Sequence, residues 1–470
     1  MNAKDRETIS GRMAEYAATL RYEDLPEDVR ELAHLVLLDT LGCALAGSTT
    51  DEVISIRQAM SAASGGAGDG SLWGTNDRLP LPLAALANGA AVHAREIDDF
   101  GGCAHSGSVV IPAALGVAAR VGASGRELLT AIVIGYDIAK RAMDGGGGYL
   151  AFKAVGWHST SACGGFGAAA AAGRLLGLDA RRIQWALGYA GSNAGGTWAF
   201  IPEGAMSKRV HPGFAAQSGV VSAYLAASGV TAPETIFEAE WGGYYSTYVP
   251  GKATPENATA GLGTEFRIKH VGFKPYAACR GIHSSVDVVL AMRERHHVKA
   301  ADVANVVVRG SRTHVKQLGK QAVQTALDAQ MSLPYSIAAA LETGGAMLDQ
   351  YTAEALRRPS IAALAQRVTV VHEPAVADGE EPYVDVELKN GERLSDRVTV
   401  ARGDHTNPLS EAELVSKFRT TAGLVFDAAH VSRLENAVRD IAKSDNVRAL
   451  DELMRPATGV KAPRTPASVV

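Results

Sequence analysis

The first half of the chain carries a helical pattern of apolar residues, from Arg21 to about residue 235. The segment DVRELAHLVLLDTLGCALAG (28–47) repeats apolar positions at spacings of three and four until it reaches Gly42 and Gly47. The stretches 108–122 and 164–196 continue this pattern with many alanines and glycines. Because small side chains let backbones approach closely, the sequence predicts a compact, buried helical bundle.

The pattern changes near residue 265, where strand-like segments begin. The runs VANVVVRG (303–310) and RVTVVHEP (367–374) are typical of strands, and YVDVELKNGERLSDRVTV (383–400) predicts a hairpin around Asn390-Gly391. Helical stretches separate these strands, and amphipathic helices return after about residue 400. The expected fold is mainly α with an inserted α+β domain. We assign 1–266 and 399–458 to the helical domain, 267–398 to the α+β domain and 459–470 to a disordered tail.

Composition and charge narrow the class of protein. The 470 residues include 47% apolar and 20% charged side chains, an ordinary balance for a soluble globular protein. A net charge of −4 provides no basic surface for nucleic acid or an anionic membrane. We find no secretory signal and no apolar run of the ~18–20 residues that a membrane span needs. Four scattered cysteines fit a reducing compartment, so we expect a cytoplasmic protein.

An acidic cluster in the helical half could carry acid–base chemistry. Glu96, Asp98 and Asp99 precede His105, and carboxylates beside an imidazole suit proton transfer. The alternative is a helix cap with solvated turn acids, because Asp before paired glycines is common in loops.

A second cluster begins at His158, which is followed by the hydroxyl residues Ser159 and Thr160. The imidazole and the amides of the next helix could bind an anion. The glycines at 145–148 could form a hinge in front of it. A histidine that only caps the helix is an equal alternative.

Two basic clusters could bind an anionic substrate. Lys208 and Arg209 adjoin within an apolar helical region, where Arg can hold a carboxylate with its planar fork and Lys can act as a point charge or proton donor. Lys274, Arg280 and His283 mark the junction of the two domains, a common place for a site. The alternatives are a basic surface turn and a basic linker.

The sequence lacks the common cofactor and nucleophile motifs. It contains no GxGxxG after a strand, no GxxxxGKS/T, no HExxH and no GxSxG. Asp98, Asp99 and His105 could in principle bind a metal, but their spacing matches no recognised metal motif. We therefore expect neither a cofactor nor a metal.

Taken together, six segments resemble the MmgE/PrpD family, which includes 2-methylcitrate dehydratase, cis-aconitate decarboxylase and iminodisuccinate epimerase. The resemblance runs over about residues 6–455. It rests on LLDTLGCALAG (37–47), HSGSVVIPAALGVA (105–118), GWHSTSACGGFGAAAAAGRLLGL (156–178), GAMSKRVHPGFAAQSG (204–219), KPYAACRGIHSSVD (274–287) and AQMSLPYSIAAAL (329–341). It implies a cofactor-free homodimer in which the α+β domain forms a lid and the site lies in the cleft between the domains.

The resemblance also implies roles for the residues of the four clusters, acting on a small di- or tricarboxylate. The two motif histidines of the family match His105 and His158, and the lysine of its Thr-Lys-Arg turn matches Lys208. The predicted catalytic residues are His105, His158, Lys208, Asp98 and Asp99. The predicted substrate-binding residues are Arg209, Lys274, Arg280, His283, Ser159 and Thr160.

The match departs from the family pattern beside the histidines. Phe100 stands where the family has threonine, and Ser106 and Ser159 follow the two histidines where proline is usual. Because loss of a hydroxyl contact can alter selectivity strongly, we expect the substrate to differ more than the reaction class.

In the expected mechanism one imidazole removes a proton beside a carboxylate, a second imidazole delivers a proton, and nearby cations stabilise the developing charge. This set supports dehydration, epimerisation or decarboxylation. We expect a hydro-lyase first, then an isomerase, then a decarboxylase. An inactive dimeric binding protein and a metal-dependent hydrolase are the alternatives from other classes.

Overall fold

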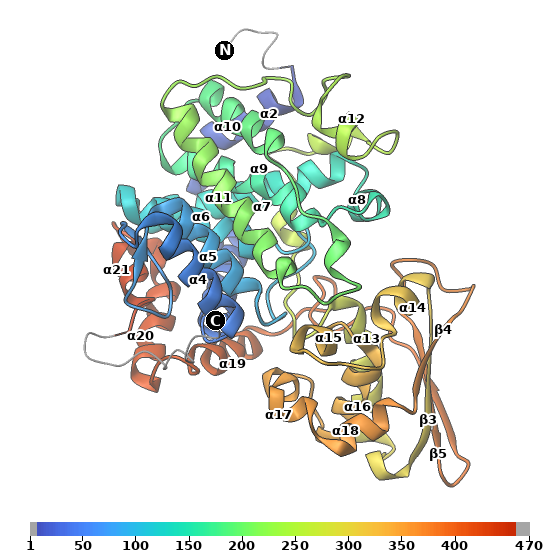
Figure 1. The fold of residues 1–470 in the computed structure, drawn as a ribbon. Helices are drawn as coiled ribbons and strands as arrows, with labels where there is room; N and C mark the ends of the chain where they lie inside the picture. The colour runs from blue at the N-terminus through green and yellow to red at the C-terminus, as the bar shows by residue number, and fades with distance from the viewer. Residues whose placement is uncertain (1–6, 457–470) are drawn as a thin grey trace.

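The computed structural model describes residues 7–456, which form a large helical domain and a smaller domain built on a four-stranded sheet (Figure 1). The fold class predicted from the sequence is confirmed. The predicted tail, 459–470, lies outside the described residues. Within 7–456 no single helix is long and apolar enough to cross a membrane. Only the pair Glu27–Gly47 and Asp51–Ser64, bent by 87°, meets that test by length and composition.

The helical domain begins with a series of helices joined by short loops. They are α2 (Ile9–Thr19), α3 (Glu27–Gly47), α4 (Asp51–Ser64), α5 (Leu81–His93), α6 (Gly107–Val121), α7 (Gly125–Gly145), α8 (Tyr149–Val155), α9 (Ser159–Leu175), α10 (Ala180–Ser192), α11 (Ser207–Ala227) and α12 (Tyr244–Tyr248). A short ribbon, β1 (Gly70–Ser71) with β2 (Arg78–Leu79), lies between α4 and α5.

Glycines set the spacing of the central helices. Helix α9 packs against α6, α7 and α11, and a Cβ on its Gly167 would lie 2.2 Å from the carbonyl oxygen of Gly135 in α7. A Cβ on Gly213 of α11 would lie 2.3 Å from the carbonyl oxygen of Leu86 in α5. Larger side chains would force these backbones apart. This close packing brings the end of α5 and the starts of α6, α9 and α11 together.

The smaller domain is a mixed sheet with strand order β4-β3-β5-β6. Strands β3 (Val303–Gly310) and β4 (Val368–His372) run parallel, and β5 (Tyr383–Leu388) pairs antiparallel with both β3 and β6 (Arg393–Asp396). The strands predicted at 303–310 and 367–374 and the hairpin around Asn390-Gly391 are confirmed. Gly391 adopts φ 89°, which suits glycine in a tight turn.

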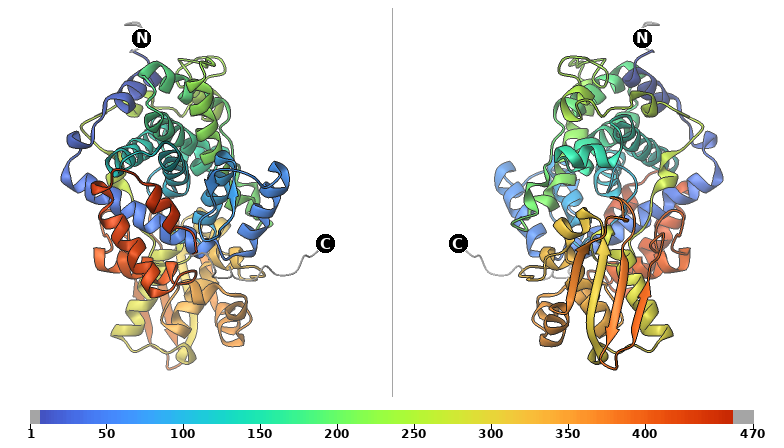
Figure 2. Two further views of the ribbon diagram at one scale, coloured as in Figure 1. Left: turned by 90° about the vertical axis from the view of Figure 1, so that its left-hand side faces the viewer. Right: turned by 90° about the vertical axis from the view of Figure 1, so that its right-hand side faces the viewer.

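Helices cover one face of this sheet (Figure 2). Helices α16 and α13 contact β4 and β5, and α18 packs on α16. The helices of this domain are α13 (His283–Arg295), α14 (Arg312–Leu318), α15 (Ala326–Gln330), α16 (Leu333–Thr343), α17 (Ala353–Leu356) and α18 (Pro359–Ala365).

The chain returns to the helical domain through α19 (Glu411–Ala422), α20 (Ala428–Arg439) and α21 (Arg448–Leu453), which lie beside the first helices in Figure 1. Helix α19 packs on α3, and α21 packs on α6. The segment that leaves the helical domain contacts the segment that returns to it, because the amide of Phe273 donates to the carbonyl of Gly403 at 2.7 Å. Gly272 also pairs with Phe100, so the loop before His105 contacts the segment that leaves the helical domain.

Candidate active site

Glu96 lies at the centre of three buried cations. Helix α5 ends at His93, and the chain then turns through Glu96 at φ 54°, a backbone conformation that costs about 1–3 kcal/mol outside glycine. The Glu96 carboxylate accepts hydrogen bonds from Lys208, from Arg209 Nη1 at 2.6 Å and from Lys274 Nζ at 3.0 Å. Burial alone would raise the pKa of Glu96, but these positive charges hold it well below its usual range.

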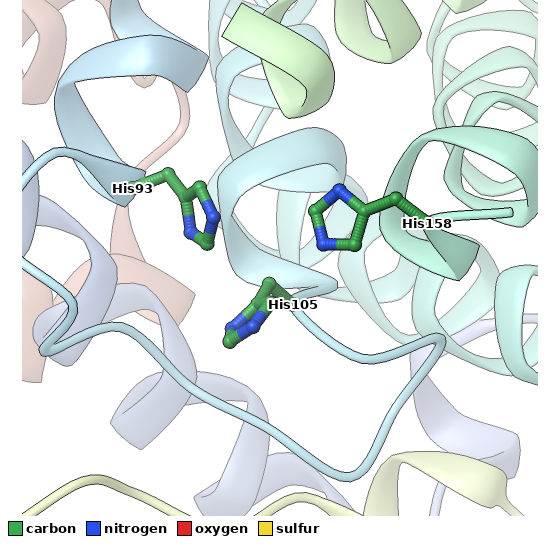
Figure 3. A group of neighbouring side chains, drawn as sticks. All are labelled: His93, His105 and His158. Carbon is green, nitrogen blue, oxygen red and sulfur yellow. The ribbon is translucent and has the colours of Figure 1, made fainter. Parts of the chain in front are cut away.

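Three imidazoles converge in this region (Figure 3), and Nε2 of His93 lies 3.9 Å from Oε1 of Glu96. His93 is the last residue of α5, His105 lies in the loop before α6, and His158 directly precedes α9. The ring centroids of His93 and His105 are 4.6 Å apart, and those of His158 lie 6.0 Å from His93 and 6.3 Å from His105. Three segments from two different stretches of the helical domain thus form one cluster.

Asp98 orients two of these rings. Its Oδ2 lies 2.8 Å from Nδ1 of His93 and 3.4 Å from Nδ1 of His105. Nδ1 of His105 is also 2.7 Å from the carbonyl oxygen of Asp99, so its Nε2 is left to face a substrate. Burial lowers the pKa of His105 to about 3, although the Asp98 charge opposes this shift. Both rings are therefore neutral near pH 7 without a ligand, because burial also lowers the pKa of His93.

Asp99 makes the contacts of a helix cap. The amide of Gly107, at the start of α6, donates to both of its carboxylate oxygens at 3.1 Å. Burial and the neighbouring Asp98 charge raise the pKa of Asp99 well above its usual range. These contacts match the capping alternative for this residue, and its predicted catalytic role stays a prediction.

His158 is held on both sides of its ring. Its Nδ1 lies 3.1 Å from Nδ1 of His211 in α11, and its Nε2 lies 3.2 Å from the hydroxyl of Thr160. The indole of Trp198 packs edge-on at 5.2 Å. Burial lowers the pKa of His158 well below its usual range, and the cations and imidazoles around it act in the same direction.

A cavity of about 400 Å³ opens from this cluster between the two domains. Its inner wall is formed by Glu96, His105, His158 and Lys208, and its outer wall includes Arg280 and residues of α8 and α14. Four of the predicted site residues therefore line it: His105, His158, Lys208 and Arg280. The other seven, Asp98, Asp99, Arg209, Lys274, His283, Ser159 and Thr160, are buried and do not line it.

Arg280 and His283, like Arg209 and Lys274, already have partners within the protein. Arg280 pairs with Glu381 at 2.8 Å and Asp404 at 3.5 Å, and its guanidinium lies 5.2 Å from the centre of the Phe100 ring. His283 places Nε2 3.0 Å from the carbonyl of Ala278. Arg280 and His283 both support the wall that contains Phe100, the position where the sequence departs from its family.

The predicted catalytic and substrate-binding residues did not include two central members of this site, His93 and Glu96. Glu96 stood in the acidic run before His105, but only the fold reveals the three cations that surround it. His93 lies at the end of an apolar helix, where a single histidine carries no distinctive spacing. Its Nε2 is buried and has no hydrogen-bond partner among the described residues.

The three imidazoles could also be considered as metal ligands, since ring nitrogens of His93, His105 and His158 all lie within 4.8 Å of one another. Three histidines suit a zinc-like ion. However, Thr160 and His211 occupy the two nitrogens of His158, and the charge of Lys208 acts on both His93 and His158. The metal-free site stays a prediction.

Comparison with known proteins agrees with this two-domain organisation. The MmgE/PrpD N-terminal domain matches residues 11–256, and the MmgE/PrpD C-terminal domain matches residues 276–443. The chain belongs to the MmgE/PrpD family, as its sequence motifs predicted.

The curated relatives are similar over nearly their whole length. The cis-aconitate decarboxylase-like protein oryM of Aspergillus oryzae is 30% identical over 94% of this chain and 96% of its own. The cis-aconitate decarboxylase of Aspergillus terreus is 28% identical, covering 95% and 96%, and that of Homo sapiens is 27% identical, covering 93% and 92%. Decarboxylases are lyases, so the prediction of an enzyme of the lyase class is confirmed at that level.

Proposed function

We propose that the protein decarboxylates a small unsaturated tricarboxylate of the cis-aconitate type. The observation that carries the proposal is the inner wall of the cavity, where the free nitrogen of His105 faces the same space as the ammonium of Lys208. A proton donor beside a fixed cation suits a reaction that builds negative charge next to a carboxylate.

The chemistry needs one proton and no other reagent. In cis-aconitate the bond between the methylene carbon and its carboxylate breaks, and carbon dioxide leaves. The electron pair of that bond forms a terminal double bond, while the pair of the old double bond takes a proton at the CH carbon. The product is an unsaturated diacid. In this scheme His105 donates the proton, Asp98 positions its ring, and Lys208 stabilises the charge that develops on the adjacent carboxylate.

The low pKa of free His105 is compatible with this role. At neutral pH the ring of the ligand-free enzyme is uncharged, because burial lowers its pKa to about 3. A bound tricarboxylate brings several negative charges beside the ring, and nearby negative charge raises the pKa of an imidazole. The ring thus takes up the proton as substrate binds and delivers it during the reaction.

The order of preference differs from the one predicted from the sequence. The imidazoles and cations alone allowed dehydration, epimerisation or decarboxylation, and the family resemblance favoured dehydration as the commonest role in the family. The curated relatives named above are two cis-aconitate decarboxylases and a cis-aconitate decarboxylase-like protein, each similar to this chain over more than nine-tenths of its length, which favours decarboxylation. A homodimer and a cytoplasmic location are proposed as well, on the family resemblance and the cysteine usage.

The test is to incubate the purified protein with cis-aconitate, citrate and 2-methylcitrate and to follow carbon dioxide and products by NMR. Carbon dioxide and a terminal alkene from cis-aconitate support the proposal, with activity lost in His105→Gln and retained in the exposed control His296→Gln. Alkenes formed from citrate or 2-methylcitrate without carbon dioxide would assign a dehydratase. Absence of turnover of all three would contradict a tricarboxylate lyase.

A further inference from the structure

Lys153 is a cation on the cavity wall that the sequence analysis did not select. It lies in α8, half-buried, and its ammonium is 5.8 Å from the centre of the Tyr149 ring and 6.0 Å from that of Trp198. All three residues line the cavity between the domains. Cation–π contacts of this kind hold an ammonium group in place without neutralising its charge.

Each of the other cations of the site contacts a carboxylate of the protein. Lys208 and Lys274 both bind Glu96, and Arg280 binds Glu381. Among residues 7–456, by contrast, no carboxylate lies within 4.0 Å of the ammonium of Lys153. A cation that faces a cavity without a partner is suited to an anion that enters from solvent.

We propose that Lys153 binds one carboxylate of the substrate at the outer end of the cavity and so contributes to selection of a polycarboxylate. This inference rests on the proposed function for the class of ligand. Trp198 connects the two ends of the site, since its ring lies 5.2 Å from the His158 ring and 6.0 Å from the Lys153 ammonium. In the proposed binding mode one carboxylate lies beside Lys208, another lies beside Lys153, and the reacting carbon lies beside His105, since all three residues line the same cavity.

The titratable groups that interact electrostatically with Lys153 are Cys279, Asp378 and His314, all in the smaller domain. The charge of Asp378 acts on Lys153, but its carboxylate also accepts a hydrogen bond from the amide of Thr313 at 3.3 Å. His314 faces Lys153 from the same side, and burial lowers the pKa of both groups. The alternative role for Lys153 is a structural one, a latch in which it attracts Asp378 and holds the two domains together. Mutation of Asp378 distinguishes this latch from substrate binding.

The experiment measures binding by calorimetry with three probes: cis-aconitate, citraconate, which lacks its methylene carboxylate, and glutaconate, which lacks its central one. The Lys153→Met variant is expected to bind cis-aconitate about tenfold or more weakly, because a charged hydrogen bond is lost. Lys153→Arg should bind within about threefold of the wild type. The control Lys299→Met removes an exposed lysine of the smaller domain that does not line the cavity, and it should leave binding unchanged.

The probes show whether the effect is local. If Lys153 holds one particular carboxylate, the dicarboxylate that lacks it binds Lys153→Met and wild type equally well. Equal weakening of all three probes would assign to Lys153 the carboxylate on the CH carbon, which all three share. Unchanged affinity for cis-aconitate would overturn the proposal. The same loss in Asp378→Asn would assign the latch instead.

Failure of the proposed function is distinguishable from failure of this inference. Lys153-dependent binding of cis-aconitate without release of carbon dioxide would remove the decarboxylase and leave the anion site. Release of carbon dioxide with the same KM in Lys153→Met and wild type would keep the decarboxylase and overturn the role of Lys153.

Discussion

Lys274 Nζ lies 3.0 Å from Glu96 Oε2, and both side chains are almost completely buried. The opposite oxygen of the same carboxylate binds Lys208 and Arg209, so one acid offsets three cations. Lys274 also lies 3.6 Å from Asp98 Oδ1, so the buried cluster holds two acids against three cations. Of these cations Lys208 lines the cavity, where it can meet an anionic substrate although the whole chain has a net charge of −4.

Replacing Glu96 should destabilise the fold as well as the site. Glu96→Gln leaves buried cations without their counter-charge, and breaking a buried ion pair from one side costs about 3–5 kcal/mol. Unfolding in urea measures this loss. The control is Glu387→Gln, which breaks an exposed pair with Arg393 and should cost less than about 1 kcal/mol. Equal, small losses in both variants would show that Glu96 does not balance the cations.

The buried imidazoles should make the fold sensitive to acid. In the folded protein burial lowers the pKa of His105 to about 3, whereas an unfolded histidine titrates near ~6.5. Between these pH values the unfolded chain binds more protons than the folded chain, so the free energy of unfolding rises with pH. The stability that depends on the neutral His105 ring is lost progressively as pH falls below ~6.5. The contribution of His105 is about 1.4 kcal/mol for each pH unit within that window.

Urea unfolding at several pH values between ~4 and ~7 tests this dependence. His105→Gln should show a shallower slope than wild type by about the stated amount, and the exposed variant His296→Gln should keep the wild-type slope. Identical slopes in all three proteins would mean that His105 is not buried as a neutral ring.

Asp98 should act through His105 rather than on the substrate. Asp98→Asn keeps the shape of the side chain but removes the charge that favours the protonated ring. We expect kcat to fall by about 10²–10⁴-fold, the range for general acid catalysis, with a smaller change in KM. The pH profile of kcat should shift to lower pH, since the ring becomes harder to protonate. A fall in kcat with no shift in the profile would argue that Asp98 only supports the fold.

Removal of metal ions should leave the enzyme active. Both nitrogens of His158 contact protein groups, and a positive charge next to the cluster disfavours a cation. After dialysis against a strong chelator, turnover of cis-aconitate should stay within error of the untreated enzyme, and elemental analysis should find far less than one metal ion per chain. Stoichiometric metal, with activity lost on chelation and restored by one ion, would contradict this expectation.

Phe100 should influence which tricarboxylates are accepted. Its ring lies against Arg280 and edge-on to His283 on the wall of the cavity. Phe100→Thr exchanges an apolar surface for a hydroxyl, so kcat/KM should shift by about tenfold in favour of cis-aconitate over an alkyl-substituted analogue. Phe100→Leu keeps the surface apolar and should alter this ratio little. The same ratio in Phe100→Thr and wild type would show that residue 100 does not select the substrate.

Several features of the fold followed from local patterns. The strand-like run at 303–310 and the Asn390-Gly391 turn predicted a strand and the hairpin, because strand propensity and turn conformation depend on neighbouring residues. The motifs around His105, His158 and Lys208 located the inner wall of the cavity. The role of Glu96 was not predictable, because it depends on cations that are more than 110 residues away in the sequence.

Contacts within the protein also changed the roles expected for individual side chains. Arg209 has the chemistry of a carboxylate ligand, but the structure engages it with Glu96 and with Gln330 at 2.6 Å. Lys153 drew no attention in the sequence, since a single lysine in a short helix has no distinctive pattern. Only the cavity and the absence of a nearby carboxylate within residues 7–456 make it a candidate ligand for substrate.

The most direct test of the account is turnover of cis-aconitate in deuterated water, followed by NMR of the product. Because the proton on His105 exchanges with solvent, we predict that each molecule of diacid formed carries one deuterium at the carbon that was CH in the substrate, with one carbon dioxide released. Product without deuterium at that carbon, or deuterium entering the substrate with no loss of carbon dioxide, would contradict proton donation coupled to decarboxylation at this site.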